Sequence, residues 1–164
     1  MQQVNQGQPT FATFAPHEGE AYWTVGMLVV VKVWGRETAG RFSVCEFLCP
    51  PGFAPPVHLH RRQDESFWVL EGRLQYRIGD KEIIAGAGSY IYLPLGVPHG
   101  FRVISEETAR LVHFAVPAGM EEFHAELGVR TEQLTVPPPA PLDIPHVLEV
   151  STKYGIEVVG PPIE

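Results

Sequence analysis

A pair of closely spaced histidines is the clearest chemical signal in this sequence. His58 and His60 are separated by a single residue. Side chains alternate between the two faces of a β-strand, so both imidazoles point the same way, with Cβ atoms roughly 6.6 Å apart. Two such rings can reach one ion at metal–nitrogen distances of roughly 2.0–2.1 Å. The pair therefore predicts a metal site on one face of a strand.

Glu65 and His99 extend this candidate site, and each depends on a turn. Glu65 follows His58 by an odd number of positions, which would place it on the opposite face of a continuous strand. The polar segment 61–64 is therefore expected to reverse the chain, so that Glu65 enters the next strand facing the same interior. His99 follows the turn at 94–96, where proline and glycine favour a tight reversal.

Three imidazoles and one carboxylate form a mixed nitrogen and oxygen ligand set. This set suits one divalent transition metal, which can be Fe, Mn, Ni, Co, Cu or Zn. Affinity order alone does not select among these ions. We therefore predict His58, His60, Glu65 and His99 as the metal ligands and leave the metal unassigned.

The segments around these residues have the pattern of an antiparallel β-sandwich or barrel. Eight short runs of β-branched and aromatic residues alternate with turn residues. The runs are Met27–Trp34, Phe42–Cys49, Ser66–Leu70, Leu74–Ile78, Lys81–Ala85, Ser89–Leu93, Gly100–Ile104 and Arg110–Val116. Glu71-Gly72 and Gly79-Asp80 predict two-residue hairpin turns, so the strands on either side of each are expected to pair. The proline-rich stretch 50–56 is expected at the barrel mouth or on an edge.

Three regions are expected along the chain. Residues 1–16 are polar and rich in glutamine, which predicts a flexible arm able to add a strand to a partner. Residues 17–118 are assigned to the barrel, and residues 119–164 to an extension that packs on it. The extension is expected to contain a helix over Met120–Leu127, an extended proline-rich linker and a last short helix before Gly155.

Composition and charge exclude several classes of function. The net charge is −7, with 19 acidic and 12 basic residues, and no segment concentrates enough lysine and arginine to bind nucleic acid. The longest apolar run, Met27–Val31, is far too short to span a bilayer, so no membrane association is expected. The N-terminus lacks a basic region followed by an apolar core, and we therefore expect a cytoplasmic location.

The two cysteines are expected to be reduced core residues. Cys45 and Cys49 are four positions apart. On an extended strand this spacing separates them by roughly 13 Å, too far for a disulfide bond.

Two motifs in the sequence resemble those of the cupin superfamily. The first, G-x5-H-x-H-x4-E-x6-G, is matched by Gly52, His58, His60, Glu65 and Gly72. The second, G-x5-P-x-G-x2-H-x3-N, is matched by Gly88, Pro94, Gly96 and His99, with Val103 in place of the final asparagine. The four ligand positions are intact.

The resemblance extends to small single-cupin proteins related to quercetin 2,3-dioxygenase. It covers Gly52–Gly72, Gly88–Phe101, Pro117–Gly128 and Lys153–Pro162. It implies an all-β fold, a single cupin (jelly-roll) β-barrel with one or two short C-terminal helices. It also implies a bound metal and a homodimer. Fold alone does not give function.

Three functions remain open at this point. The first is a metal-dependent dioxygenase that acts on a small phenolic or enolic, flavonol-like substrate with O2, and in which Glu65 is the catalytic base. The second is an isomerase or decarboxylase of a small keto or hydroxy acid, which uses the ion as a Lewis acid and consumes no oxygen. The third is a non-enzymatic domain that binds a small molecule.

Large side chains of the barrel are expected to fill its core and to line the cavity beside the metal. The candidates for the substrate pocket are Phe47, Phe67, Tyr76, Phe101 and His113. His113 could face either the cavity or a neighbouring strand. Three other histidines, His17, His124 and His146, are expected on the surface.

Overall fold

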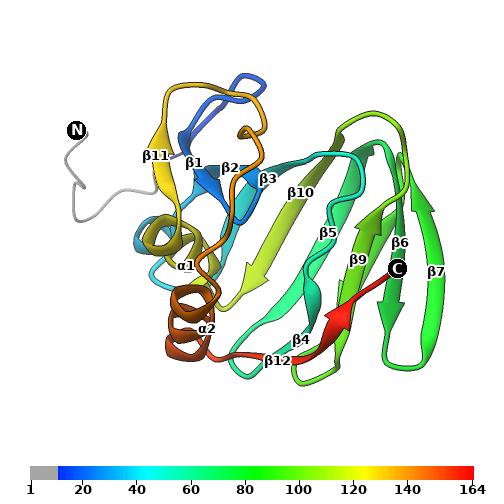
Figure 1. Ribbon diagram of the computed structural model, residues 1–164. Helices are drawn as coiled ribbons and strands as arrows, with labels where there is room; N and C mark the ends of the chain where they lie inside the picture. Colours follow the sequence, from blue (N-terminus) through cyan, green and yellow to red (C-terminus); the bar gives the residue numbers. More distant parts are fainter. Residues whose placement is uncertain (1–10) are drawn as a thin grey trace.

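The computed structural model describes residues 11–164, which form two antiparallel β-sheets and two short helices (Figure 1). The larger sheet has the strand order β11-β1-β2-β3-β10-β5-β8, and the smaller has the order β12-β4-β9-β6-β7. The strands are β1 (Glu20–Thr24), β2 (Met27–Val33), β3 (Ser43–Cys49), β4 (Pro56–His60), β5 (Asp64–Glu71), β6 (Arg73–Ile78), β7 (Lys81–Gly86), β8 (Tyr90–Leu93), β9 (His99–Val103), β10 (Ala109–Val116), β11 (Val129–Thr131) and β12 (Ile156–Pro162). The predicted all-β fold with short C-terminal helices is confirmed.

The eight predicted strands are all present, and their ends differ from the expected ones by at most two residues. The turn at Gly79-Asp80 joins a true hairpin, because Ile78 on β6 pairs with Lys81 on β7. The hairpin predicted at Glu71-Gly72 is wrong. Strand β5 belongs to the larger sheet and β6 to the smaller, so this turn carries the chain from one sheet to the other.

Gly72 makes that crossing between the sheets possible. Its φ of +86° lies in the left-handed region, where residues with a side chain are strained. A Cβ at this position would lie 2.8 Å from the Cα of Ala109 on the neighbouring β10. Gly72 is therefore a turn residue, as predicted. Its role is to allow two strands to approach closely, and it does not form a hairpin.

The main hydrophobic core lies between the two sheets and is built from inward-facing residues of both. Side chains alternate along β5, since Phe67 and Val69 are buried whereas Trp68 and Leu70 are exposed. Cys45 and Cys49 are buried and free, as expected. Burial raises the pKa of both thiols, which keeps them protonated.

Residues 119–164 contribute to both sheets as well as forming helices. Helix α1 (Met120–Leu127) lies beside the larger sheet, and helix α2 (Ile144–Lys153) lies next to α1 and contacts β12 of the smaller sheet (Figure 1). Both helices were predicted. Strands β11 and β12 were not: β11 pairs with β1 in the larger sheet, and β12 pairs with β4 in the smaller. The last strand therefore lies directly beside the strand that carries His58 and His60.

The predicted N-terminal arm begins outside the described residues, which start at residue 11. Between residues 11 and 164, no helix combines the length and the apolar character needed to cross a membrane.

Candidate metal centre

The four predicted ligands come together in the interior, at the facing surfaces of the two sheets. His58 and His60 project from β4, His99 from β9 and Glu65 from β5. One ligand atom from each residue lies within 4.8 Å of those of the other three. His60, Glu65 and His99 are buried, and His58 is partly exposed, so solvent reaches the cluster on the side of His58.

The strand register explains why three imidazoles meet. His58 and His60 share one face of β4, as their spacing predicts, and their ring centroids are 5.1 Å apart. His58 is paired directly with His99 across the β4–β9 ladder, and these rings are 4.7 Å apart. Three rings from two adjacent antiparallel strands therefore converge on one point.

A turn brings Glu65 to the same point from the other sheet, and a hydrogen bond ties it to the turn that precedes His99. The chain bends at Arg61-Arg62 and enters β5 at Asp64, which is the reversal that the polar segment predicts. The Asp64 carboxylate accepts a hydrogen bond of 2.7 Å from the backbone N–H of Leu95, in the turn before His99. The turns that deliver Glu65 and His99 are thus tied to each other.

Hydrogen bonds to the backbone orient two of the imidazoles. Nδ1 of His58 lies 2.7 Å from the carbonyl of Pro56, and Nδ1 of His99 lies 2.9 Å from that of Val97. Nε2 of His99 also lies 3.2 Å from Oε2 of Glu65. A carbonyl only accepts, so Nδ1 carries a proton in both rings, and in the neutral ring Nε2 then has a lone pair. This is the tautomer that a metal ligand needs.

The ring of His60 is also available to bind a metal ion. Its Nε2 lies 3.0 Å from Oε2 of Glu65 but has no hydrogen-bond partner among the described residues, and its Nδ1 has none either. Buried polar atoms without a partner are rare in folded proteins, and a missing ion is one common explanation. The three imidazoles and the carboxylate therefore fit a divalent transition metal ion by donor type as well as by position.

The charge states of the ligands also suit a metal ion. Burial, and after it the neighbouring His99, lower the pKa of His58 to about 4. Burial alone would raise the pKa of the Glu65 carboxyl, but nearby His60 and the hydrogen bond from His113 hold it well below its ordinary value. At neutral pH the cluster thus presents a neutral His58 and an ionised carboxylate, the protonation states that bind metals.

The five residues predicted to line a substrate pocket are all buried inside the barrel. The rings of Phe67, Tyr76 and Phe101 lie 5.5 to 6.2 Å from one another, measured between centroids, and they form one aromatic group. Phe47 packs on Phe67 and on His113. His113 faces the interior and forms a hydrogen bond of 2.7 Å with Oε1 of Glu65. The structure therefore connects His113 to the metal centre, whereas the other four form the apolar surroundings.

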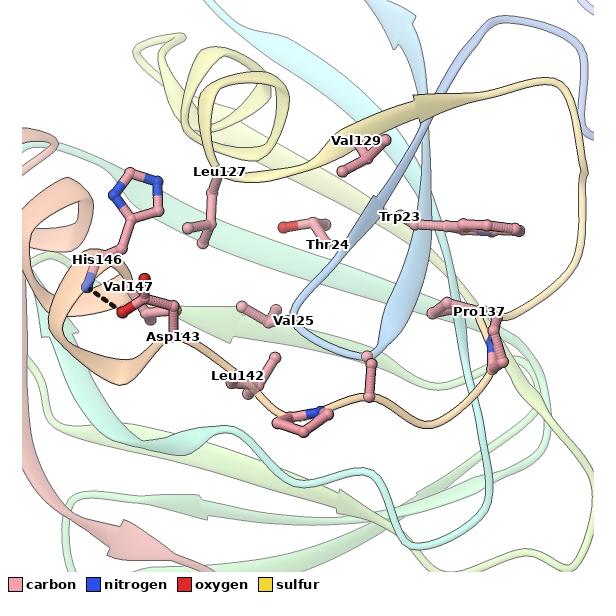
Figure 2. A pocket seen from close by; sticks show the side chains of 14 residues that line it. Trp23, Thr24, Val25, Leu127, Val129, Pro137, Leu142, Asp143, His146 and Val147 are labelled. Carbon is pink, nitrogen blue, oxygen red and sulfur yellow. Dashed lines mark hydrogen bonds between the residues drawn. The ribbon is translucent and has the colours of Figure 1, made fainter.

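Two surface cavities lie away from the cluster. One, of about 370 Å³, is enclosed by the β1–β2 turn, the end of α1 and the proline-rich linker, and Figure 2 shows Val25, Leu127 and Leu142 around it. The other, of about 440 Å³, lies between α2 and β12. None of the four predicted ligands lines either cavity.

The expectation of a surface position for His124 is wrong. The side chain is only 4% exposed, and its ring stands edge-on to Phe47 at 5.0 Å. His124 follows Met120 by four positions, which places both on the buried face of α1. The sequence shows this spacing, but the predicted buried face of the helix did not include His124. Of the other two histidines, His146 is exposed and His17 partly exposed.

The sequence is similar to a known protein family and to curated proteins. The family profile described as "Cupin domain" matches residues 46–115, a segment that contains all four predicted ligands. Quercetin 2,3-dioxygenase of Bacillus subtilis (strain 168) is 28% identical over 121 residues, which are 74% of this chain and 36% of that protein. The chain spans between 15% and 52% of the length of the curated relatives that it matches.

Solved structures show the same fold. A RmlC-like cupin from Shewanella frigidimarina NCIMB 400 has a TM-score of 0.57 at 17% identity, over 70% of this chain and 99% of that one. The polyketide cyclase RemF from Streptomyces resistomycificus also has a TM-score of 0.57, at 24% identity over 65% of this chain and 80% of that one. At these identities the likeness concerns the fold alone.

Proposed function

We propose that this chain, which belongs to the cupin superfamily, is a metal-dependent dioxygenase that acts on a small phenolic or enolic, flavonol-like substrate. The observation that carries the proposal is the convergence of His58, His60, Glu65 and His99 on one buried point. The name of the Bacillus subtilis relative supports the choice of reaction and substrate class.

The protein's own part in metal binding follows from its ligand atoms. His58 and His99 would use Nε2, because their Nδ1 atoms are bonded to backbone carbonyls. Glu65 would use Oε2, the oxygen that lies 3.0 Å from His60 and 3.2 Å from His99. A bound divalent ion acidifies a hydroxyl group coordinated to it and brings the substrate and dioxygen together.

Glu65 is the residue proposed to take the proton of the substrate hydroxyl. Its low pKa keeps the carboxylate ionised at neutral pH, which is the form that accepts a proton. Oε1 is already bonded to His113, so the proton would be taken up on Oε2, which would then hold the metal more weakly. Removing this proton leaves the substrate oxygen anionic and more reactive toward dioxygen.

The apolar surroundings support a planar aromatic substrate. Phe67 and Phe101 pack against each other in the buried aromatic group, against which such a molecule would stack. The hydroxyl of Tyr76 is fully buried and has no hydrogen-bond partner within residues 11–164. A polar atom of this kind inside an aromatic group suits a substrate that carries hydroxyl or carbonyl groups.

Oxygen uptake distinguishes this proposal from the other metal-dependent activities. Purified protein is loaded with each candidate divalent ion and assayed in an oxygen electrode with flavonols, simpler phenols and enols. The proposal expects uptake with at least one metal and one substrate. Turnover of a keto or hydroxy acid without oxygen uptake would instead support the isomerase or decarboxylase alternative. Ligand binding without turnover would support the binding alternative.

Variants separate the roles of the ligands. Glu65→Gln should retain much of the metal and lose turnover, because the amide cannot accept the proton. His99→Ala should lose the metal itself, and both effects are measured by elemental analysis alongside oxygen uptake. His146→Ala, which removes an exposed histidine outside the cluster, is the matched control and should change neither. A Glu65→Gln protein with full activity would contradict the assignment of the base.

A further inference from the structure

His113 lies next to the metal centre without belonging to it. It projects from β10, which pairs with the Glu65 strand β5, and its side chain is 0% exposed. Its Nε2 lies 2.7 Å from Oε1 of Glu65. The four clustered ligand atoms do not include a nitrogen of His113. The contact is therefore made with the far side of the carboxylate.

The direction of this hydrogen bond follows from the chemistry of the two groups. An ionised carboxylate has no proton to give, so Nε2 of His113 must carry the hydrogen and donate it. Nδ1 has no hydrogen-bond partner among the described residues, so nothing there competes to hold the ring in another orientation.

Two aromatic rings pack against the His113 ring. The ring of Phe47 is stacked on it at 4.8 Å with an interplanar angle of 26°, and the ring of Phe67 lies at 4.9 Å with an angle of 35°. Neither phenylalanine offers a hydrogen bond. The His113 ring thus packs against apolar rings, and its hydrogen bond goes to the Glu65 carboxylate.

We propose that His113 is a positioning residue for Glu65: by donating to Oε1, it fixes the carboxylate so that Oε2 alone faces His60 and His99. This inference rests on the proposed metal site. Outer partners that orient a ligand typically change metal affinity by roughly 10–100-fold when they are removed. His113 therefore sets both the position of the fourth ligand and the oxygen that is available to take a proton.

Cobalt(II) is the probe for the experiment, because its visible absorption reports the geometry of its ligands. His113→Phe removes the donor and keeps an aromatic ring against Phe47 and Phe67. We expect the full-length variant to bind cobalt roughly 10–100-fold more weakly than the wild type, with an altered absorption spectrum. His113→Gln, whose amide nitrogen can replace Nε2 as donor, should restore most of the affinity and the wild-type spectrum.

His124→Phe is the matched control. His124 is buried beside Phe47 and His113, but no hydrogen bond joins it to Glu65. Its replacement should leave cobalt affinity within about twofold of the wild type. Wild-type affinity and spectrum in His113→Phe would overturn the proposal, and so would equal losses in His113→Phe and His124→Phe.

A second measurement does not depend on any variant retaining its fold. In the metal-free wild-type protein, a long-range proton–nitrogen NMR spectrum should show a hydrogen on Nε2 of His113. An Nε2 without a hydrogen would overturn the inference. If the wild type fails to bind cobalt, the proposed function fails, while this spectrum still decides whether His113 donates to Glu65.

Discussion

The buried histidine of helix α1 is expected to make the metal-free protein sensitive to acid. His124 is 4% exposed, and Nδ1 of its ring has no hydrogen-bond partner among the described residues. Burial, and after it the neighbouring His113, lower the pKa of His124 to about 3. His60 acts in the same direction, whereas Glu65 opposes it.

The size of the effect follows from the two pKa values. In the unfolded chain the pKa of His124 is about 6.5, so between about pH 6.5 and about pH 3 only the unfolded chain binds the proton. The free energy of unfolding therefore falls as the pH falls through this range. The loss from this one group is about 2 kcal/mol at pH 5, and it approaches about 5 kcal/mol below pH 3.

His124→Phe isolates this contribution, because phenylalanine keeps the edge-on contact with Phe47 and cannot be protonated. Urea unfolding of both proteins is measured between pH 8 and pH 5 in the presence of a chelator. The variant should gain about 2 kcal/mol relative to the wild type between these limits. Phe123→Leu, on the same buried face, is the control and should change stability equally at every pH. Parallel pH profiles for His124→Phe and the wild type would refute the reasoning.

Three further outcomes are expected. Gly72→Ala should lower the free energy of unfolding by about 1–3 kcal/mol more than Gly40→Ala does. Both glycines have a positive φ, but only at Gly72 would a Cβ meet another strand. Equal urea midpoints for the two variants would contradict this. Cobalt(II) at a hundred times its dissociation constant should stabilise the wild type by about 2.7 kcal/mol, and an unchanged urea midpoint would argue against a site formed only in the folded state. The homodimer implied by the resemblance is tested by light scattering over a range of protein concentrations, where a monomer mass throughout would refute it.

The sequence was most informative where local spacing decides the outcome. Strand parity alone places His58 and His60 on one face, and the polar segment 61–64 was enough to predict the reversal before Glu65. Helix α1 followed from the spacing of Met120, Phe123 and Leu127 and the glycine after it. These features depend on residues within a few positions of each other, so one chain read alone contains the information.

Pairing between distant segments was not accessible in the same way. The turn residues at Glu71-Gly72 are equally suited to a hairpin and to a crossing between sheets, and only the position of β10 decides between them. Strands β11 and β12 find their partners β1 and β4 about a hundred residues away along the chain. No periodicity within such a short strand identifies its partner.

The candidate metal centre depends both on local spacing and on pairing between distant segments, and Glu65 depends on both. Local spacing could deliver this residue to the interior, but it could not say which of its two oxygens faces the imidazoles. That choice depends on His113, a residue 48 positions away on β10 that contacts Oε1 at 2.7 Å. In the sequence His113 had no spacing that related it to the other histidines. Because a carboxylate with both oxygens free can turn toward either side, the long-range contact from β10 gives Glu65 the defined orientation on which its proposed roles as ligand and base depend.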